Sequence, residues 1–131
     1  METATGTFDV ASASEEPYRE APGEARLTHA LGTQAFRGDI VGEGSIHWLM
    51  CYLPAGGARM VGIHRIEGSI CGHEGSVVLE AIGEHSGKSS KSTWRVIPGT
   101  GTGELAGLTG EGSFEAPGGP RVSYRLEFEL A

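Results

Sequence analysis

Alternating apolar and polar residues make segment 46–52 the clearest structural signal in the chain. Its even-numbered residues share one side of an extended strand, namely Ile46, Trp48, Met50 and Tyr52. A period of two residues is typical of a β-strand with one buried face. Segment 54–56, with the sequence ProAlaGly, predicts a three-residue hairpin loop in which Gly56 takes the left-handed conformation. A second strand that starts near Ala58 is therefore expected to pair with the first.

The loop length decides which residues of these two strands lie opposite one another. The predicted pairs are Tyr52–Ala58, Met50–Met60, Trp48–Gly62 and Ile46–His64. A further turn near 72–75 predicts a third strand, in which Val77 lies opposite Ile70. The three strands then share one apolar face, and His64 is a polar residue within it.

Five other segments show strand patterns: 5–11, 26–36, 93–98, 108–115 and 121–130. Turns are predicted near 86–88 and over 116–120. Segment 12–24 is rich in glutamate and contains two prolines, which predicts a surface loop. The alternation in 26–36 changes phase, which predicts a bulge near Gly32. About eight antiparallel strands with one inner face close most simply into an all-β, up-and-down barrel, because closure leaves no exposed edge. A β-sandwich is the alternative.

Length and charge narrow the class of protein. The 131 residues correspond to one domain, which we expect to span 1–131. Seventeen acidic and ten basic residues give a net charge of -7. The basic residues are scattered, which argues against binding to nucleic acid. No basic leader and no apolar run of about 18 residues is present, so we expect a cytoplasmic protein without a membrane partner. Cys51 and Cys71 are expected to be free thiols.

Four segments carry a resemblance to a known family: 38–44 (GlyAspIleValGlyGluGly), 49–52, 61–63 and 98–107 (ProGlyThrGlyThrGlyGluLeuAlaGly). They resemble a family of small bacterial domains of unknown function that is related to the allene oxide cyclase-like and lipocalin-like barrels. The resemblance implies an eight-stranded antiparallel barrel with an internal pocket. Its relatives include plant cyclases that act on unstable fatty-acid epoxides, but it implies no particular reaction. The chain departs from the family where His64 replaces a usual acidic residue and where Ala13 lies near a usual tryptophan, so a role tied to that acid does not carry over.

Cofactor and metal sites are not expected from the motifs present. Segment 101–106 matches GxGxxA, yet Pro98 and Gly107 leave no room for the helix that a dinucleotide site requires. We expect this segment to cross one end of the barrel. Cys71 and His73 offer two metal ligands, whereas a structural zinc ion takes four. No serine lies in a strand–turn–helix nucleophile elbow.

The predicted inner face has the composition of a small-molecule site. An eight-stranded barrel is wide enough to be filled by its own side chains or to hold one small ligand. The residues predicted to contact a substrate are Trp48, Met50, Tyr52, Met60, Trp94 and Tyr124. His64 is the candidate catalytic acid or base, because its ordinary pKa is close to neutral. The structural alternative is a core histidine that is hydrogen-bonded to a tyrosine hydroxyl.

These residues favour a cyclase or isomerase that needs no cofactor and acts on a small apolar molecule, for example in natural-product biosynthesis. Such a reaction needs little more than a shaped cavity and one proton donor or acceptor. The first alternative is a barrel that binds a hydrophobic ligand without chemistry. A second is a filled barrel that acts through its surface.

The outer face of the central strands is also apolar at several positions. The residues predicted to face outward are Leu49, Cys51, Val61, Ile63, Val78 and Ile82. This is more apolar surface than a monomer usually exposes in one place. We therefore expect a homo-oligomer that covers it.

Overall fold

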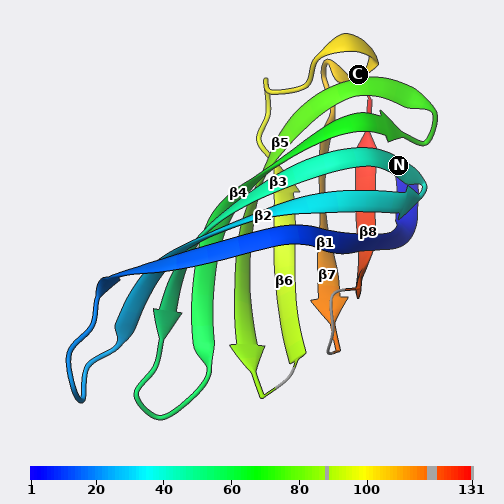
Figure 1. The fold of residues 1–131 in the computed structure, drawn as a ribbon. Coiled ribbons are helices and arrows are strands. Elements are labelled where there is room, and N and C mark those ends of the chain that lie inside the picture. The colour runs from blue at the N-terminus through cyan, green and yellow to red at the C-terminus, as the bar shows by residue number, and fades with distance from the viewer. Residues whose placement is uncertain (88, 118–120, 131) are drawn as a thin grey trace.

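The segments with period-two alternation form strands, because the extended conformation places every second side chain on one face. In a computed structural model, which describes residues 1–87, 89–117 and 121–130, eight antiparallel strands pair in chain order and β8 pairs with β1 (Figure 1). The strands are β1 (Glu2–Arg19), β2 (Arg26–Gly38), β3 (Ile40–Tyr52), β4 (Ala58–Ile70), β5 (His73–Ser86), β6 (Ser89–Val96), β7 (Thr109–Ala116) and β8 (Arg121–Glu129). The closed all-β barrel is confirmed, and the sandwich alternative is wrong.

The hairpin of β3 and β4 has the predicted register. Met50 lies opposite Met60, and Ile46 lies opposite His64. Gly56 has a φ of +108°, in the region that favours glycine. Near the loop the inward residues Trp48, Met50 and Tyr52 are half-buried, and the other inward side chains of this hairpin are buried. Most residues between them are exposed. Local alternation and a short loop were sufficient to specify this part of the sheet.

The next hairpin is tighter than predicted. Its turn consists of Cys71 and Gly72, with φ of +49° and +85°, and Val77 lies opposite Ile66 rather than Ile70. Positive φ at both central residues is characteristic of the turns that match the twist of paired strands. Because the predicted register differs by an even number of residues, each side chain keeps its predicted face. The position of the turn was wrong, but the assignment of the core was not affected.

Strand β1 is longer than predicted, and the surface loop over 12–24 is wrong in its first part. The strand continues to Arg19 and pairs with β2 as far as Arg19 opposite Leu27, with an irregularity between Pro17 and Arg19. Its residues from 11 onward are exposed, so the sequence shows no apolar alternation there. Pro17 is tolerated because, among the described residues, this part of β1 pairs only with β2 and forms a sheet edge. The bulge predicted near Gly32 lies instead in β1, between Val10 and Ser12.

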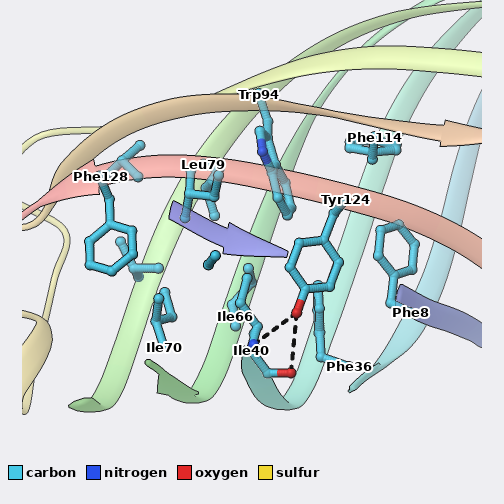
Figure 2. Packing of buried hydrophobic residues seen from close by; sticks show 14 of the residues in the cluster. Phe8, Phe36, Ile40, Ile66, Ile70, Leu79, Trp94, Phe114, Tyr124 and Phe128 are labelled. Carbon is cyan, nitrogen blue, oxygen red and sulfur yellow. Dashed lines mark hydrogen bonds between the residues drawn. The ribbon is translucent and has the colours of Figure 1, made fainter. Parts of the chain in front are cut away.

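One end of the barrel is closed by its own side chains. The segment between β6 and β7, which includes the 3₁₀ turn η1 (Gly103–Leu105), packs across this end and buries Leu105 and Leu108. Thr102 anchors it, because its Oγ1 lies 3.0 Å from the amide nitrogen of Ser76, which donates a hydrogen bond to it. Figure 2 shows the apolar side chains that fill the interior, including Ile40, Ile66, Ile70, Leu79 and Phe128. The predicted crossing of one barrel end is confirmed, and η1 is too short for a dinucleotide site.

The other end of the barrel is open on one side. Strand β8 pairs with β1 only as far as Arg121 opposite Asp9, and β1 then continues without β8. Figure 1 shows the far ends of β1 to β4 splaying away from β7 and β8. The turns predicted near 86–88 and over 116–120 extend beyond the described residues. No helix in the described ranges is long and apolar enough to cross a membrane.

Candidate functional site

His64 lies on the inner face of β4, between the packed end and the open end of the barrel. Its side chain is fully buried. The indole of Trp48 meets it edge-on with ring centroids 4.8 Å apart, and the ring of Phe114 lies 5.6 Å away. Neither Nδ1 nor Nε2 has a hydrogen-bond partner among the described residues. The alternative of a histidine bonded to a tyrosine hydroxyl is therefore wrong for the described part of the chain.

Burial determines the protonation state of this histidine. Removal from water lowers the pKa of His64 to about 4, because the charged imidazolium loses its hydration. The side chain is therefore neutral at pH 7. A neutral imidazole carries one N–H donor and one acceptor nitrogen. His64 thus offers both a donor and an acceptor to any group that reaches it.

Two further buried side chains share this lack of partners, and sequence analysis did not identify them. Gln34 on β2 is 2% exposed, and Ser92 on β6 is 5% exposed. Both amide atoms of Gln34 and the hydroxyl of Ser92 lack a hydrogen-bond partner among the described residues. A signal was present in the sequence, because Gln34 is in phase with inward Phe36 and Ser92 with inward Trp94. We name Gln34, His64 and Ser92 the polar belt.

The belt residues come from alternate strands and face the same interior. Ser92 lies opposite Phe114 in the β6–β7 pair, and Phe114 contacts the ring of His64. Gln34 lies opposite Gly44, which in turn lies opposite Ile66, the next inward residue after His64. In a barrel with tilted strands, alternate strands supply the side chains of one interior layer. The belt therefore marks the boundary between the packed end and the open end.

Trp48, Met50 and Met60 lie between the belt and the open end. Met60 is buried, whereas Trp48 and Met50 are half-buried and so reach solvent on this side. The ring of Trp48 crosses β4 at Gly62, where an added Cβ would lie 2.7 Å from the ring. Methionine side chains adapt their shape readily. Five hollows of about 300 to 680 Å³ lie mainly along the outer side of the strands, and neither Gln34 nor His64 lines any of these five.

A hydrogen-bonded cluster holds Tyr52 at the rim of the open end. Thr28 and Tyr52 both donate to Oε2 of Glu15, each at 2.6 Å. Burial raises the pKa of Tyr52 to about 12, and the carboxylate of Glu15 adds to this effect. Burial alone would raise the pKa of Glu15, but the two hydrogen bonds and the charge of Arg26 outweigh it and lower the pKa. The phenol of Tyr52 therefore stays protonated and serves to shape the rim.

Trp94 and Tyr124 lie in the packed core with their polar atoms satisfied. The indole nitrogen of Trp94 donates to the carbonyl oxygen of Arg125 at 3.2 Å. The hydroxyl of Tyr124 accepts from the amide of Ile40 at 2.8 Å (Figure 2). It donates to the carbonyl oxygen of Arg37 at 2.9 Å. Burial also raises the pKa of Tyr124 to about 12. These two residues form apolar walls next to the belt, and their polar atoms are engaged by the backbone.

No group of three or more potential metal ligands comes together within the described ranges. Cys51 on β3 and Cys71 in the β4–β5 turn are free thiols. The chemistry that the interior offers is therefore that of the neutral imidazole, the amide and the hydroxyl of the belt.

Comparisons with known proteins identify relatives without a known activity. A family model described as a protein of unknown function, DUF3224, matches residues 4–128. A crystal structure of a DUF3224 protein of unknown function from Shewanella oneidensis MR-1 is similar, with 25% sequence identity and a TM-score of 0.80. The alignment covers 100% of this chain and 98% of that one. No curated protein matches.

Proposed function

The chain belongs to the DUF3224 family, and we propose that its barrel binds a small apolar molecule through the open end. One neutral polar group of this molecule contacts the polar belt. The apolar remainder lies against Trp48, Met50 and Met60. The relationship to allene oxide cyclase-like barrels that the sequence resembles belongs to the same proposal.

The unpartnered atoms of the belt carry this proposal. Buried polar groups are almost always hydrogen-bonded, and leaving one unpaired costs about 1–3 kcal/mol. Within the described residues, the five unpartnered buried side-chain atoms all belong to Gln34, His64 and Ser92. Three such residues on one inner layer lower the free energy of unfolding, and an apolar side chain at each position would avoid that loss. A guest molecule that supplies a donor and an acceptor would offset that cost.

The open end favours entry from one side. Trp48 and Met50 are half-buried, and the part of β1 that carries Glu15 extends beyond its pairing with the described residues of β8. The belt contains no charged side chain at pH 7, because burial keeps His64 neutral. Burying a charged group there would be costly without a counter-charge. The preferred guest is therefore a neutral molecule with an amide, hydroxyl or carbonyl group.

Cyclisation or isomerisation of the bound molecule is the second candidate function, and the neutral state of His64 favours it. A neutral imidazole can accept a proton from a bound substrate and return it at another atom. The enclosing walls would hold a flexible substrate in a reactive shape, which is a large entropic contribution to rate. Neither step needs a cofactor.

A titration followed by tryptophan fluorescence tests binding. Octanamide and octane are matched probes, since they share the apolar chain and differ in the polar end. We expect octanamide to bind more tightly by roughly 3- to 10-fold, which corresponds to one net hydrogen bond. The double variant Gln34→Leu/His64→Leu should lose this preference, whereas Leu49→Ala on the outer face should keep it. Equal affinity of the native protein for the two probes would refute a role of the belt in binding.

The variant His64→Gln separates binding from chemistry. Glutamine keeps a donor and an acceptor but cannot take up a proton near neutral pH. For any substrate that the native protein converts, the variant should bind it and fail to turn it over. Unchanged turnover would show that His64 is not the acid or base.

A further inference from the structure

Gln34 differs from the other two residues of the polar belt in the shape of its polar group. Its side chain ends in a planar amide, in which a carbonyl oxygen and an NH₂ group lie side by side. Neither Oε1 nor Nε2 has a hydrogen-bond partner among the described residues, although the side chain is only 2% exposed. The amide therefore offers one acceptor and one donor in the same plane and next to each other.

The side chains around Gln34 cannot supply these hydrogen bonds. On the neighbouring strands Gln34 lies opposite Val10 of β1 and Gly44 of β3. Along β2 the adjacent inward positions are Gly32 and Phe36. None of these four residues has a polar side-chain atom. A matching donor and acceptor must therefore come from a group that is brought to the amide.

Gly44 and Phe36 restrict the directions from which such a group can approach. An added Cβ at Gly44 would collide with Oε1 of Gln34 and would lie 2.8 Å from the ring of Phe36, so the amide lies close against β3. The φ of Gly44 is outside the left-handed region, so the space for the amide is what favours glycine here. Phe36 is 4% exposed and closes the side toward the packed end. The amide is open only toward the other end of the barrel.

Small residues line β2 on this open side. Gly32 and Ala30 are the next two inward positions, and both are half-buried. From Gln34 to Ala30 this wall extends about 13 Å along the strand. The ring of Trp48, which lies opposite Ala30, turns away from β2 and crosses β4 at Gly62. We name Ala30 and Gly32 the approach lane, because a guest can reach Gln34 over them.

We propose that Gln34 recognises an amide whose N–H and C=O lie on the same side, as in a lactam or a primary amide. This inference rests on the binding function proposed above and specifies the polar group of the guest. The N–H of the guest donates to Oε1 of Gln34, and Nε2 donates to the carbonyl oxygen of the guest. Glutamine forms the same paired contact with the donor and acceptor on the edge of adenine. Both unpartnered atoms of the amide are satisfied by one group.

Other polar groups fit Gln34 less well. An open-chain secondary amide is almost always trans, so its N–H and C=O point in opposite directions. A ketone, an ester or a lactone has an acceptor but no donor. A carboxylic acid carries both only in its protonated form, and its carboxylate would be buried without a counter-charge. The lactam and the primary amide are therefore the preferred classes.

Titration with caprolactam and caprolactone, followed by tryptophan fluorescence, tests this assignment. The two rings have the same size and differ only in the N–H of the lactam and the ring oxygen of the lactone. We expect the native protein to bind caprolactam more tightly by roughly 3- to 10-fold, which corresponds to one additional net hydrogen bond. Equal affinity for the two rings would overturn the inference.

Two variants of adjacent residues on β2 assign the preference to the amide. Gln34→Leu should bind the two rings equally. Thr33→Val is the matched control, because it also removes a polar group, whose Oγ1 lies 2.9 Å from Oγ of Ser12 in an exposed position. This control should keep the preference for the lactam, and circular dichroism verifies that both variants fold. A preference that survives Gln34→Leu would refute the role of Gln34.

Ala30→Leu tests the approach lane. A larger side chain there should weaken the binding of both rings by the same factor, about 3-fold or more, and leave their ratio unchanged. Unchanged affinity would refute the approach along β2. The outcomes also separate this inference from the binding function. Equal binding of the two rings together with a preference for octanamide over octane would refute only the recognition by Gln34. Absence of binding by both rings and by octanamide would refute the binding function itself.

Discussion

The two ends of the barrel are built from the same strands but differ in whether their buried polar side chains are hydrogen-bonded. At the packed end the hydroxyl of Tyr124 is hydrogen-bonded to the backbone at Arg37 and Ile40, so its buried oxygen has partners. Toward the open end the polar belt, including His64, lacks partners among the described residues. The packed end therefore stabilises the fold. The belt lowers stability, because unpaired buried polar groups cost free energy.

The largest expected effect comes from removing a core side chain at the packed end. Phe128 is fully buried, so Phe128→Ala should destabilise the protein by about 3–5 kcal/mol through lost burial and a residual cavity. Urea denaturation followed by circular dichroism measures the change. Met50→Ala, at a half-buried residue of the open end, is the control and should cost clearly less. Similar losses at the two sites would mean that the ends do not differ in packing.

Acidification should reveal the burial of neutral His64. Its pKa is lowered from 6.5 to about 4 in the folded protein, so the unfolded chain binds more protons between these values. Stability should therefore fall as pH decreases from 6.5 to 4, by up to roughly 3 kcal/mol from this group. His64→Leu should have a shallower pH dependence over the same range, as measured by urea denaturation at each pH. Parallel curves for the two proteins would contradict the burial of His64.

The hydroxyl of Tyr124 should contribute more to stability than that of Tyr52. Tyr124→Phe leaves the buried amide of Ile40 without its partner, which should cost about 1–3 kcal/mol. Tyr52→Phe removes a bond to Glu15 near the solvent, where water can replace it, and should cost less than about 1 kcal/mol. Thermal unfolding of both variants provides the comparison. A reversed order would contradict the assignment of these tyrosines to the packed end and the rim.

The smallest expected effect is a gain in stability. His64→Leu replaces an unpartnered buried imidazole by an apolar side chain of similar size, and we expect a stabilisation of about 1 kcal/mol at pH 7. Leu79→Ala is the control, since Leu79 is a buried apolar neighbour opposite His64 and its truncation should destabilise. Urea denaturation at pH 7 compares both. A loss of stability in His64→Leu would show that the imidazole has a structural role.

Local sequence patterns were sufficient to predict which face of the sheet each strand residue occupies and how β3 pairs with β4. The alternation around Trp48 and the short loop at Gly56 depend on residues close in sequence, so both were predicted correctly. The β4–β5 turn was misplaced because Cys71 adopts a positive φ, which is uncommon for a residue other than glycine. The exposed half of β1 was missed because a strand held by backbone pairing alone leaves no apolar pattern.

The sequence by itself determined an all-β barrel, the inward position of His64 and the apolar outer face, because these follow from side-chain period and turn chemistry. Only the tertiary structure decided which inward polar groups find partners. Tyr124 meets the backbone at Ile40, more than 80 residues away, while Gln34 and Ser92 meet no partner among the described residues. Hydrogen bonding across a barrel depends on how the closed sheet aligns distant strands, and no local pattern encodes that alignment.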